Sequence, residues 1–135
     1  PWSNYIDRQR GSLLGRYTTT VDGMFEEQSA PQTMGDRQGL RQLTLDNNAT
    51  QLQITTEGMV AFSLSHFDDA QFNYDVFYGG KHPYDLVRSP QIFAHFDFWQ
   101  RGIGNHSCGG DSCLPQYMAP TGIHEFTLRF TPMAK

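Results

Sequence analysis

The sequence predicts an all-β fold of antiparallel strands, in a single domain that spans residues 1–135. Apolar and polar residues alternate with a period of two, the alternating segments are rich in β-branched and aromatic residues, and turn-forming residues separate them. A chain of 135 residues, 38% hydrophobic and 18% charged, is long and apolar enough to bury one core. Many short strands with frequent turns are typical of a β-sandwich or a β-barrel.

The expected strands follow one another along the whole chain. In the clearest of them, residues 61–67, Phe62 and Leu64 point to one face and Ser63 and Ser65 to the other. Further alternating or β-branched segments lie at residues 18–21, 42–45, 51–55, 92–98 and 126–130. Turn residues separate these segments at 46–48, 78–80, 89–90 and 119–122. Helical hints are confined to short turns at 68–72 and 82–86.

Charge and hydropathy argue against two classes of partner. The net charge is −4 and the isoelectric point is about 5.6, whereas a nucleic-acid-binding surface needs an excess of Lys and Arg. No apolar run approaches the roughly 18 residues that a membrane-spanning helix needs. The sequence begins at Pro1, without Met and without a visible signal peptide, so we expect a piece of a longer polypeptide.

The glycine-rich stretch GIGNHSCGGDSCLP, residues 102–115, is the main candidate for a functional site. It holds both cysteines, but the spacing of Cys108 and Cys113 matches no usual zinc-binding pair, and no second Cys or His pair completes a ligand set. We expect free thiols in a cytoplasmic protein, with a small local disulfide or a periplasmic location as alternatives. A nucleophilic Ser107 or Cys108 would need a positioned base, which the adjacent His106 rarely provides. A loop that contacts something outside the chain is the favoured interpretation.

Three stretches together resemble the C-terminal domain of the large bacterial β-galactosidases of glycoside hydrolase family 2. PWSNYIDR, residues 1–8, resembles the family pattern GP-x-ENY-x-DR, and PQTMGDRQGLRQL, residues 31–43, resembles PQE-x-G-x-R-x-x-x-R-x-L. FSLSHF (62–67), HPYDL (82–86) and DFWQRGIG (97–104) then follow in the order of the family. The resemblance covers essentially the whole chain.

This resemblance implies an antiparallel super-sandwich similar to galactose mutarotase, of which the chain would be roughly the C-terminal half. The family hydrolyses terminal β-D-galactosides such as lactose with retention, using two glutamates of a TIM barrel. No region of the chain matches either glutamate motif, so we expect no catalytic residue and no activity of the chain alone. The implied partners are a galactoside, the TIM-barrel domain of the same polypeptide and further copies in a homo-oligomer. We expect no cofactor in this chain; relatives often bind magnesium and sodium, mostly near the barrel.

The resemblance also assigns a role to the glycine-rich stretch. In many relatives this loop reaches the barrel and places a Trp beside the sugar, and in the Ser-Cys-Gly variant, which this chain resembles, a Cys takes that place. Cys108 would then offer a small apolar wall, with Ser107 beside it. Asn105 and His106 lie on the same loop and could hydrogen-bond sugar hydroxyls, and Trp99 precedes it. These five residues are the expected substrate-binding residues.

Two other functions remain open from the sequence. The first is a non-catalytic carbohydrate-binding module that acts independently of any barrel. The second is a mutarotase-like epimerase, for which His124 and Glu125 would supply the acid and base. Adjacent residues of a strand point to opposite faces, so this pair is expected to be strand decoration. If half of the super-sandwich is missing, an apolar face is expected to be exposed and to drive dimerisation or aggregation.

Overall fold

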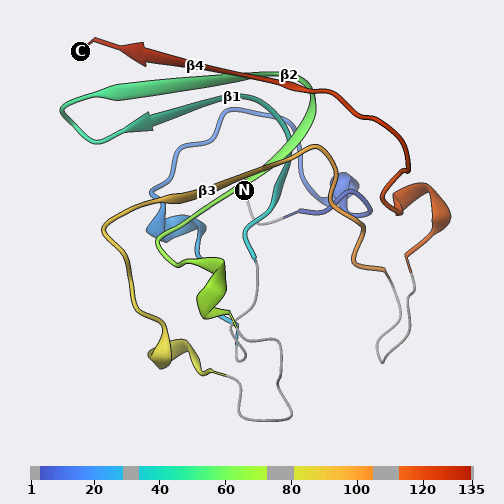
Figure 1. The fold of residues 1–135 in the computed structure, drawn as a ribbon, viewed down its shortest axis with the longest axis horizontal. Helices are drawn as coiled ribbons and strands as arrows, with labels where there is room; N and C mark the ends of the chain where they lie inside the picture. Colours follow the sequence, from blue (N-terminus) through green and yellow to red (C-terminus); the bar gives the residue numbers. More distant parts are fainter. Residues whose placement is uncertain (1–3, 29–33, 73–80, 105–112, 135) are drawn as a thin grey trace.

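The computed structural model describes residues 4–28, 34–72, 81–104 and 113–134 (Figure 1). Its elements in chain order are η1 (Gln9–Gly11), η2 (Asp22–Met24), β1 (Arg37–Asp46), β2 (Gln51–Ser65), η3 (Asp69–Gln71), η4 (Pro83–Asp85), β3 (Phe93–Asp97), η5 (Pro115–Tyr117) and β4 (Thr127–Met133). The η elements are single 3-10 turns, and the described part of the chain holds no α-helix. The described residues also include no helix long and apolar enough to cross a membrane. The predicted all-β, antiparallel fold class is confirmed.

The long strand β2 organises the four-stranded sheet. β1 pairs with it on one side, and β3 and β4 share its other side, all of them antiparallel. β4 pairs with the first half of β2, from Gln51 to Glu57, and β3 with the second half, from Ala61 to Ser65. Figure 1 shows β2 curving strongly between these halves, so that β3 crosses below the layer formed by β1 and β4. The two halves of β2 therefore run in different directions, and each half pairs with a different strand, β4 or β3.

An irregularity in the ladder produces this bend. Leu40 of β1 lies opposite Val60, whereas Gln42 lies opposite Thr55, so β2 contains extra residues between two adjacent pairings. Extra residues on one strand bend it and increase its twist. Gly58 lies inside this stretch with a φ of 95°, a left-handed conformation that glycine adopts without a steric penalty. The sequence pattern predicts β2 only as two separate shorter strands, at residues 51–55 and 61–67.

A Gly58→Ala chain is expected to lose about 1–2 kcal/mol of unfolding free energy, the penalty of a left-handed backbone at a non-glycine residue. The nearest atom to an added Cβ is 3.9 Å away, so backbone conformation and not space causes the loss. Gly11→Ala is the matched control, because a Cβ there meets nothing within 4 Å. Urea denaturation of both variants measures the effect, and equal midpoints would contradict the assignment of strain to Gly58.

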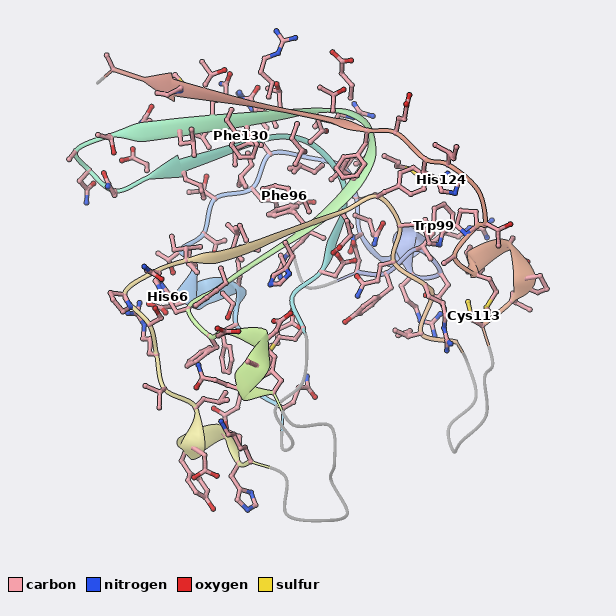
Figure 2. The ribbon with its side chains drawn as sticks, in the orientation of Figure 1. His66, Phe96, Trp99, Cys113, His124 and Phe130 are labelled. Carbon is pink, nitrogen blue, oxygen red and sulfur yellow. The ribbon has the colours of Figure 1, made fainter. Side chains whose placement is uncertain are left out.

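The core lies where β2 bends and where the N-terminal segment crosses the sheet. Val60 and Ile54 are the most deeply buried large side chains, at 0% and 1% exposed. Six further apolar residues are buried: Ile6, Met24, Leu40, Ala61, Leu64 and Phe72. The rings of Phe96 on β3 and Phe130 on β4 meet edge to face, with centroids 6.2 Å apart (Figure 2). This ring pair joins the two strands that share one edge of β2.

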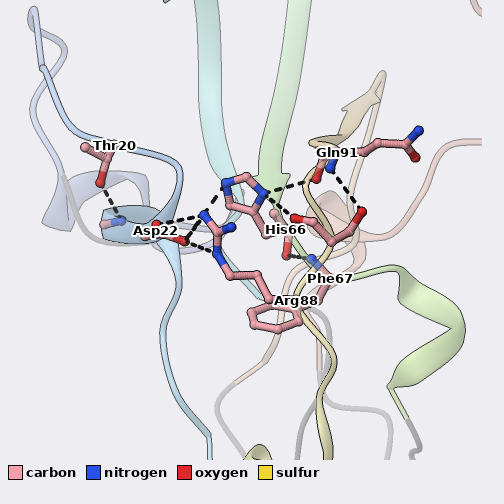
Figure 3. A network of polar contacts seen from close by, with 9 residues as sticks. Thr20, Asp22, His66, Phe67, Arg88 and Gln91 are labelled. Atoms are coloured by element: carbon pink, nitrogen blue, oxygen red, sulfur yellow. Dashed lines mark hydrogen bonds and ion pairs between the residues drawn. The ribbon is translucent and has the colours of Figure 1, made fainter. Parts of the chain in front are cut away.

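A polar network fastens the loop after η4 to the N-terminal segment (Figure 3). Arg88 donates to both carboxylate oxygens of Asp22, at 3.2 and 3.0 Å. The Nδ1 atom of His66 lies 3.0 Å from the carbonyl oxygen of Ser89 and 3.1 Å from that of Gln91. The Arg88 hydrogen bond lowers the pKa of Asp22. The network ties together segments that share no strand ladder.

Most predicted strands and both predicted helical turns are confirmed, as β1 to β4 and as the 3-10 turns η3 and η4. The predicted strand at residues 18–21 is wrong, because this segment has no ladder partner. The Thr20 hydroxyl instead accepts a hydrogen bond from Gly23 N at 3.0 Å, at the start of η2. β-branched residues favour a strand only when a neighbouring strand is present to pair with them. The predicted turn at 78–80 lies outside the described residues.

Large apolar side chains are exposed at many positions of the described chain, including the N-terminal segment and β4. In the N-terminal segment, Leu13 and Leu14 are 84% and 71% exposed. A groove of about 1770 Å³ runs between this segment and β1. On β4, Phe130 is 53% exposed and Met133 38% exposed. Phe130 and Met133 are three residues apart, so they lie on opposite faces of β4, and both faces of this strand carry partly exposed apolar side chains.

Candidate functional site

Two segments meet at the base of the glycine-rich stretch and form a stem. The outgoing segment leaves β3 through Phe98 and Trp99 and reaches Gly104. The returning segment starts at Cys113 and enters η5. Gly102 N donates to the carbonyl oxygen of Tyr117 at 3.0 Å, which joins the two sides. Figure 2 shows Trp99, Cys113 and His124 on this side of the molecule.

The N-terminal segment closes this stem. The carboxylate of Asp7 accepts hydrogen bonds from Ile103 N at 3.3 Å and from Gly104 N at 2.8 Å. Arg8 pairs with this carboxylate at 3.0 Å and donates to the carbonyl oxygen of Gly104. The Asp7 side chain is only 5% exposed. Asp7 and Arg8 therefore fix the backbone at Ile103 and Gly104, which lie 96 and 97 residues after Asp7 in the sequence.

Gly102 is needed for this close packing. A Cβ at Gly102 would lie 2.7 Å from the carboxylate carbon of Asp7 and 2.9 Å from Cys113 Sγ. Both distances are too short for a real side chain, so only glycine lets the three segments approach one another. Cys113 is a free thiol, and its sulfur lies inside this contact. Cys108, for which a free thiol was also predicted, lies outside the described residues.

The structure describes one of the five predicted substrate-binding residues. Trp99 is half-buried, its ring packs against Phe98 with centroids 6.5 Å apart, and its Nε1 is buried without a hydrogen-bond partner. The other four, Asn105, His106, Ser107 and Cys108, lie outside the described residues, so their role stays a prediction.

Trp99 lines a polar cavity of about 230 Å³ next to the stem. The other lining residues are Met34, Asp36, Ser63, Asp69, His95, Asp97 and Gln100. His95 Nε2 lies 3.6 Å from Asp69 Oδ1 on one side of the cavity. Carboxylates, an imidazole, an amide and an indole are the groups with which proteins bind hydroxyl-rich ligands. Among the described residues, no group of three or more His, Cys, Asp or Glu side chains could hold a metal ion.

Asp36 is a buried acid in this cavity. Its pKa is raised to about 6, chiefly because burial disfavours the charged form, and the negative charge of Asp97 adds to the increase. A hydrogen bond from Gln38 acts in the opposite direction. The Gln100 amide, oriented to satisfy its neighbours, donates to both Asp36 oxygens at 3.0 and 2.9 Å. Asp36 lies in the stretch 31–43 that resembles the family pattern, but no feature of the sequence indicated its burial in a cavity.

The prediction for His124 and Glu125 is wrong in one respect, because both precede β4 and neither lies on a strand. His124 stacks on Phe98 with ring centroids 4.5 Å apart, and its Nε2 lies 3.3 Å from the carbonyl oxygen of Pro120. These contacts give the imidazole a packing role against the outgoing side of the stem.

The comparisons with known proteins agree with one another. Residues 1–131 match the family described as β-galactosidase small chain. The chain belongs to the β-galactosidase small-chain family. It is 30% identical over 122 residues to the β-galactosidase of Aeromonas hydrophila. This alignment covers 90% of this chain and 11% of the relative. It is 28% identical over 131 residues to the β-galactosidase of Vibrio cholerae. This alignment covers 96% of this chain and 12% of the relative.

The small-chain family match includes every part of the site described above. It spans the segment of Asp7 and Arg8, the cavity and both sides of the stem. The chain covers only 11–12% of the length of these two relatives. The match therefore places the chain in this family. The activity of the whole relatives can be assigned to it only as a proposal.

Proposed function

We propose that this chain is the C-terminal part of a β-galactosidase that hydrolyses terminal β-D-galactosides, such as lactose, with retention. The carrying observation is the small-chain family match over residues 1–131, in a chain that spans about a tenth of its β-galactosidase relatives. The catalytic glutamates would lie in a TIM barrel elsewhere in the polypeptide, together with any magnesium and sodium. The chain alone would then be inactive.

The exposed apolar surface supports a role in assembly. Leu13 and Leu14 beside the groove, and Phe130 and Met133 on β4, leave apolar area in water that contacts with other parts of a larger protein would bury. Each fully buried side chain of this size contributes about 1.5–3 kcal/mol. In the proposal, the rest of a mutarotase-like super-sandwich covers this surface, and the completed enzyme is a homo-oligomer in the cytoplasm. The free thiol of Cys113 fits a reducing compartment.

The stem supports a role in the sugar pocket. It is closed by Asp7, Arg8 and the Gly102 to Tyr117 hydrogen bond, which fix the described residues next to the stretch 105–112. In the proposal, Asn105, His106, Ser107 and Cys108 reach the sugar site of the barrel from this stem, and Trp99 lies at its edge. Pre-ordered contacts bind better because less conformational entropy is lost on binding.

The test uses the full-length product of the gene that contains this chain. It is expected to hydrolyse lactose and o-nitrophenyl β-D-galactoside, and a product without β-galactosidase activity would refute the proposal. Exchange of residues 105–112 for a Gly-Ser segment of the same length is expected to raise KM by about tenfold or more, because the sugar loses one wall of its site. The control is the double variant Tyr84→Ser and Val87→Ser, whose side chains are 81% and 72% exposed away from the stem.

The same proteins distinguish the alternative of an independent carbohydrate-binding module. If the loop exchange leaves KM unchanged, residues 105–112 do not contribute to the pocket. Fluorescence titration of the isolated chain with galactose and lactose, following its Trp residues, is the second measurement. Saturable binding without any barrel would favour the module.

A further inference from the structure

The small polar cavity lies where four segments of the described chain meet. One face of the β2–β3 ladder forms a wall: Ser63 lies opposite His95, and Asp97 follows two residues along β3, on the same side. The other walls come from η3, from the segment that leads into β1 and from the segment after β3. They contribute Asp69, Met34, Asp36, Trp99 and Gln100. Figure 1 shows η3 and the segment that leads into β1 on the same side of β3.

The indole of Trp99 brings an unsatisfied hydrogen-bond donor to this cavity. Its Nε1 atom is buried and has no hydrogen-bond partner among the described residues. An indole N–H can donate but cannot accept. Buried donors in proteins are nearly always paired, because an unpaired one has given up its hydrogen bonds to water without a replacement. Trp99 therefore calls for an acceptor that enters the cavity from outside.

The acids of the cavity call for donors in turn. Asp36 is 4% exposed and already accepts hydrogen bonds from Gln38 and Gln100. Asp97 and Asp69 are exposed acids of the same cavity, and an ionised carboxylate has about four acceptor sites. The charge of Asp97 raises the pKa of Asp36, so negative charges already act on one another here. A further anion would add to this repulsion.

These groups together select a ligand that both donates and accepts hydrogen bonds. A bare cation would satisfy the acids but would give the indole N–H no acceptor. A neutral molecule with several hydroxyl groups meets both demands, because each hydroxyl donates one hydrogen bond and accepts up to two. The cavity volume of about 230 Å³ lies just below the roughly 300–1,000 Å³ of typical small-molecule pockets. A single sugar ring or a small polyol therefore fits better than a longer chain.

We propose that this cavity binds a neutral, hydroxyl-rich ligand of monosaccharide size, with Trp99 Nε1 as donor and Asp97 and Asp69 as acceptors. The side chains of His95 and Asp69 are 37% and 47% exposed, so a ligand can enter past them. The site contains none of residues 105–112 and requires no hydrolytic activity. It therefore goes beyond the proposed function and can be tested separately from it.

The test is hydrogen–deuterium exchange with mass spectrometry on the full-length product of the gene that contains this chain. The probes are D-galactose and myo-inositol, both neutral, and D-galacturonate as the matched anion. Peptides from residues 93–101 are expected to exchange about threefold to tenfold more slowly with either neutral probe, because a bound ligand opposes local opening. Half-saturation is expected at about 1–10 mM, as for a small ligand with few contacts. D-Galacturonate is expected to bind at least about tenfold more weakly, because the acids repel it.

Two substitutions remove one ligand contact each. Trp99→Phe keeps an aromatic ring without the N–H, and Asp97→Asn replaces an acceptor by an amide of the same shape. Each is expected to raise the half-saturating concentration about fivefold to tenfold. Glu57→Gln makes the same carboxylate-to-amide change at an exposed position of β2 outside the cavity, and is expected to leave it unchanged. Exchange in β1, residues 37–46, shows whether each variant keeps its fold, so a defect in one leaves the other as the test.

Three results would overturn the inference. The first is no protection of residues 93–101 by either neutral probe up to about 100 mM, as expected if another part of the polypeptide fills the cavity. The second is equal protection by D-galacturonate. The third is a half-saturating concentration that neither Trp99→Phe nor Asp97→Asn changes, because the probe then binds elsewhere. Protection that both substitutions weaken, in a product without β-galactosidase activity, would support the cavity site and refute the proposed function.

Discussion

An Ile54→Ala chain is expected to lose about 2–5 kcal/mol of unfolding free energy, a large part of the roughly 5–15 kcal/mol that stabilises a typical domain. Ile54 is 1% exposed and lies on β2 opposite Leu43 of β1 and Phe130 of β4. Its truncation removes apolar contacts and leaves a cavity between both pairings. Urea denaturation of the 135-residue chain, followed by Trp fluorescence and far-UV circular dichroism, measures the loss.

Ile123→Ala makes the identical chemical change at a side chain that is 95% exposed. It is expected to alter the unfolding free energy by less than about 0.5 kcal/mol. Equal destabilisation by the two substitutions, or a loss below about 1 kcal/mol for Ile54→Ala, would contradict the placement of Ile54 in the core.

The sequence predicts those parts of the fold in which local pattern and tertiary structure agree. Phe62 and Leu64 alternate with serines inside β2, and the predicted turn at 46–48 joins β1 to β2. The bend at Gly58 could not be predicted, because a glycine in an alternating segment gives no indication of how many residues a bulge inserts. Residues 18–21 show the opposite limit, since β-branched residues without a neighbouring strand form none.

The site is less predictable than the fold because its key contacts join distant segments. The stretches PWSNYIDR (1–8) and DFWQRGIG (97–104) both resemble the family pattern. Nothing in either stretch shows that the Asp7 carboxylate accepts hydrogen bonds from the N–H groups of Ile103 and Gly104. The burial of Asp36 could not be predicted from the sequence either, because its surroundings include Gln38, Gln100 and the strand that carries Asp97. Trp99 could be selected from the sequence because it lies only three residues before Gly102, where the glycine-rich stretch begins.

Asp36→Asn is expected to stabilise the chain at neutral pH. The carboxyl is 4% exposed, and its pKa is raised from 3.8 to about 6, mainly by burial. The folded state therefore holds this proton more tightly than the unfolded state, and stability falls as the pH rises from about 4 to about 6. Above that range the ionised carboxylate destabilises the fold, and a neutral amide of the same shape removes this penalty. Since the amide gives up part of the hydrogen bonding from Gln38 and Gln100, we expect a gain of about 1–2 kcal/mol at pH 7.5.

The pH dependence is the decisive part of this prediction. Below about pH 4 both states of the wild-type chain carry a protonated Asp36, so the advantage of Asp36→Asn should disappear there. Asp97→Asn is the control, because it removes a neighbouring charge from the same cavity while Asp36 remains ionisable. It should give a smaller gain at pH 7.5, since burial contributes more to the raised pKa of Asp36 than the charge of Asp97 does. An advantage of Asp36→Asn that is the same at pH 4 and pH 7.5 would mean that hydrogen bonding or packing, and not ionisation of the buried acid, determines its effect.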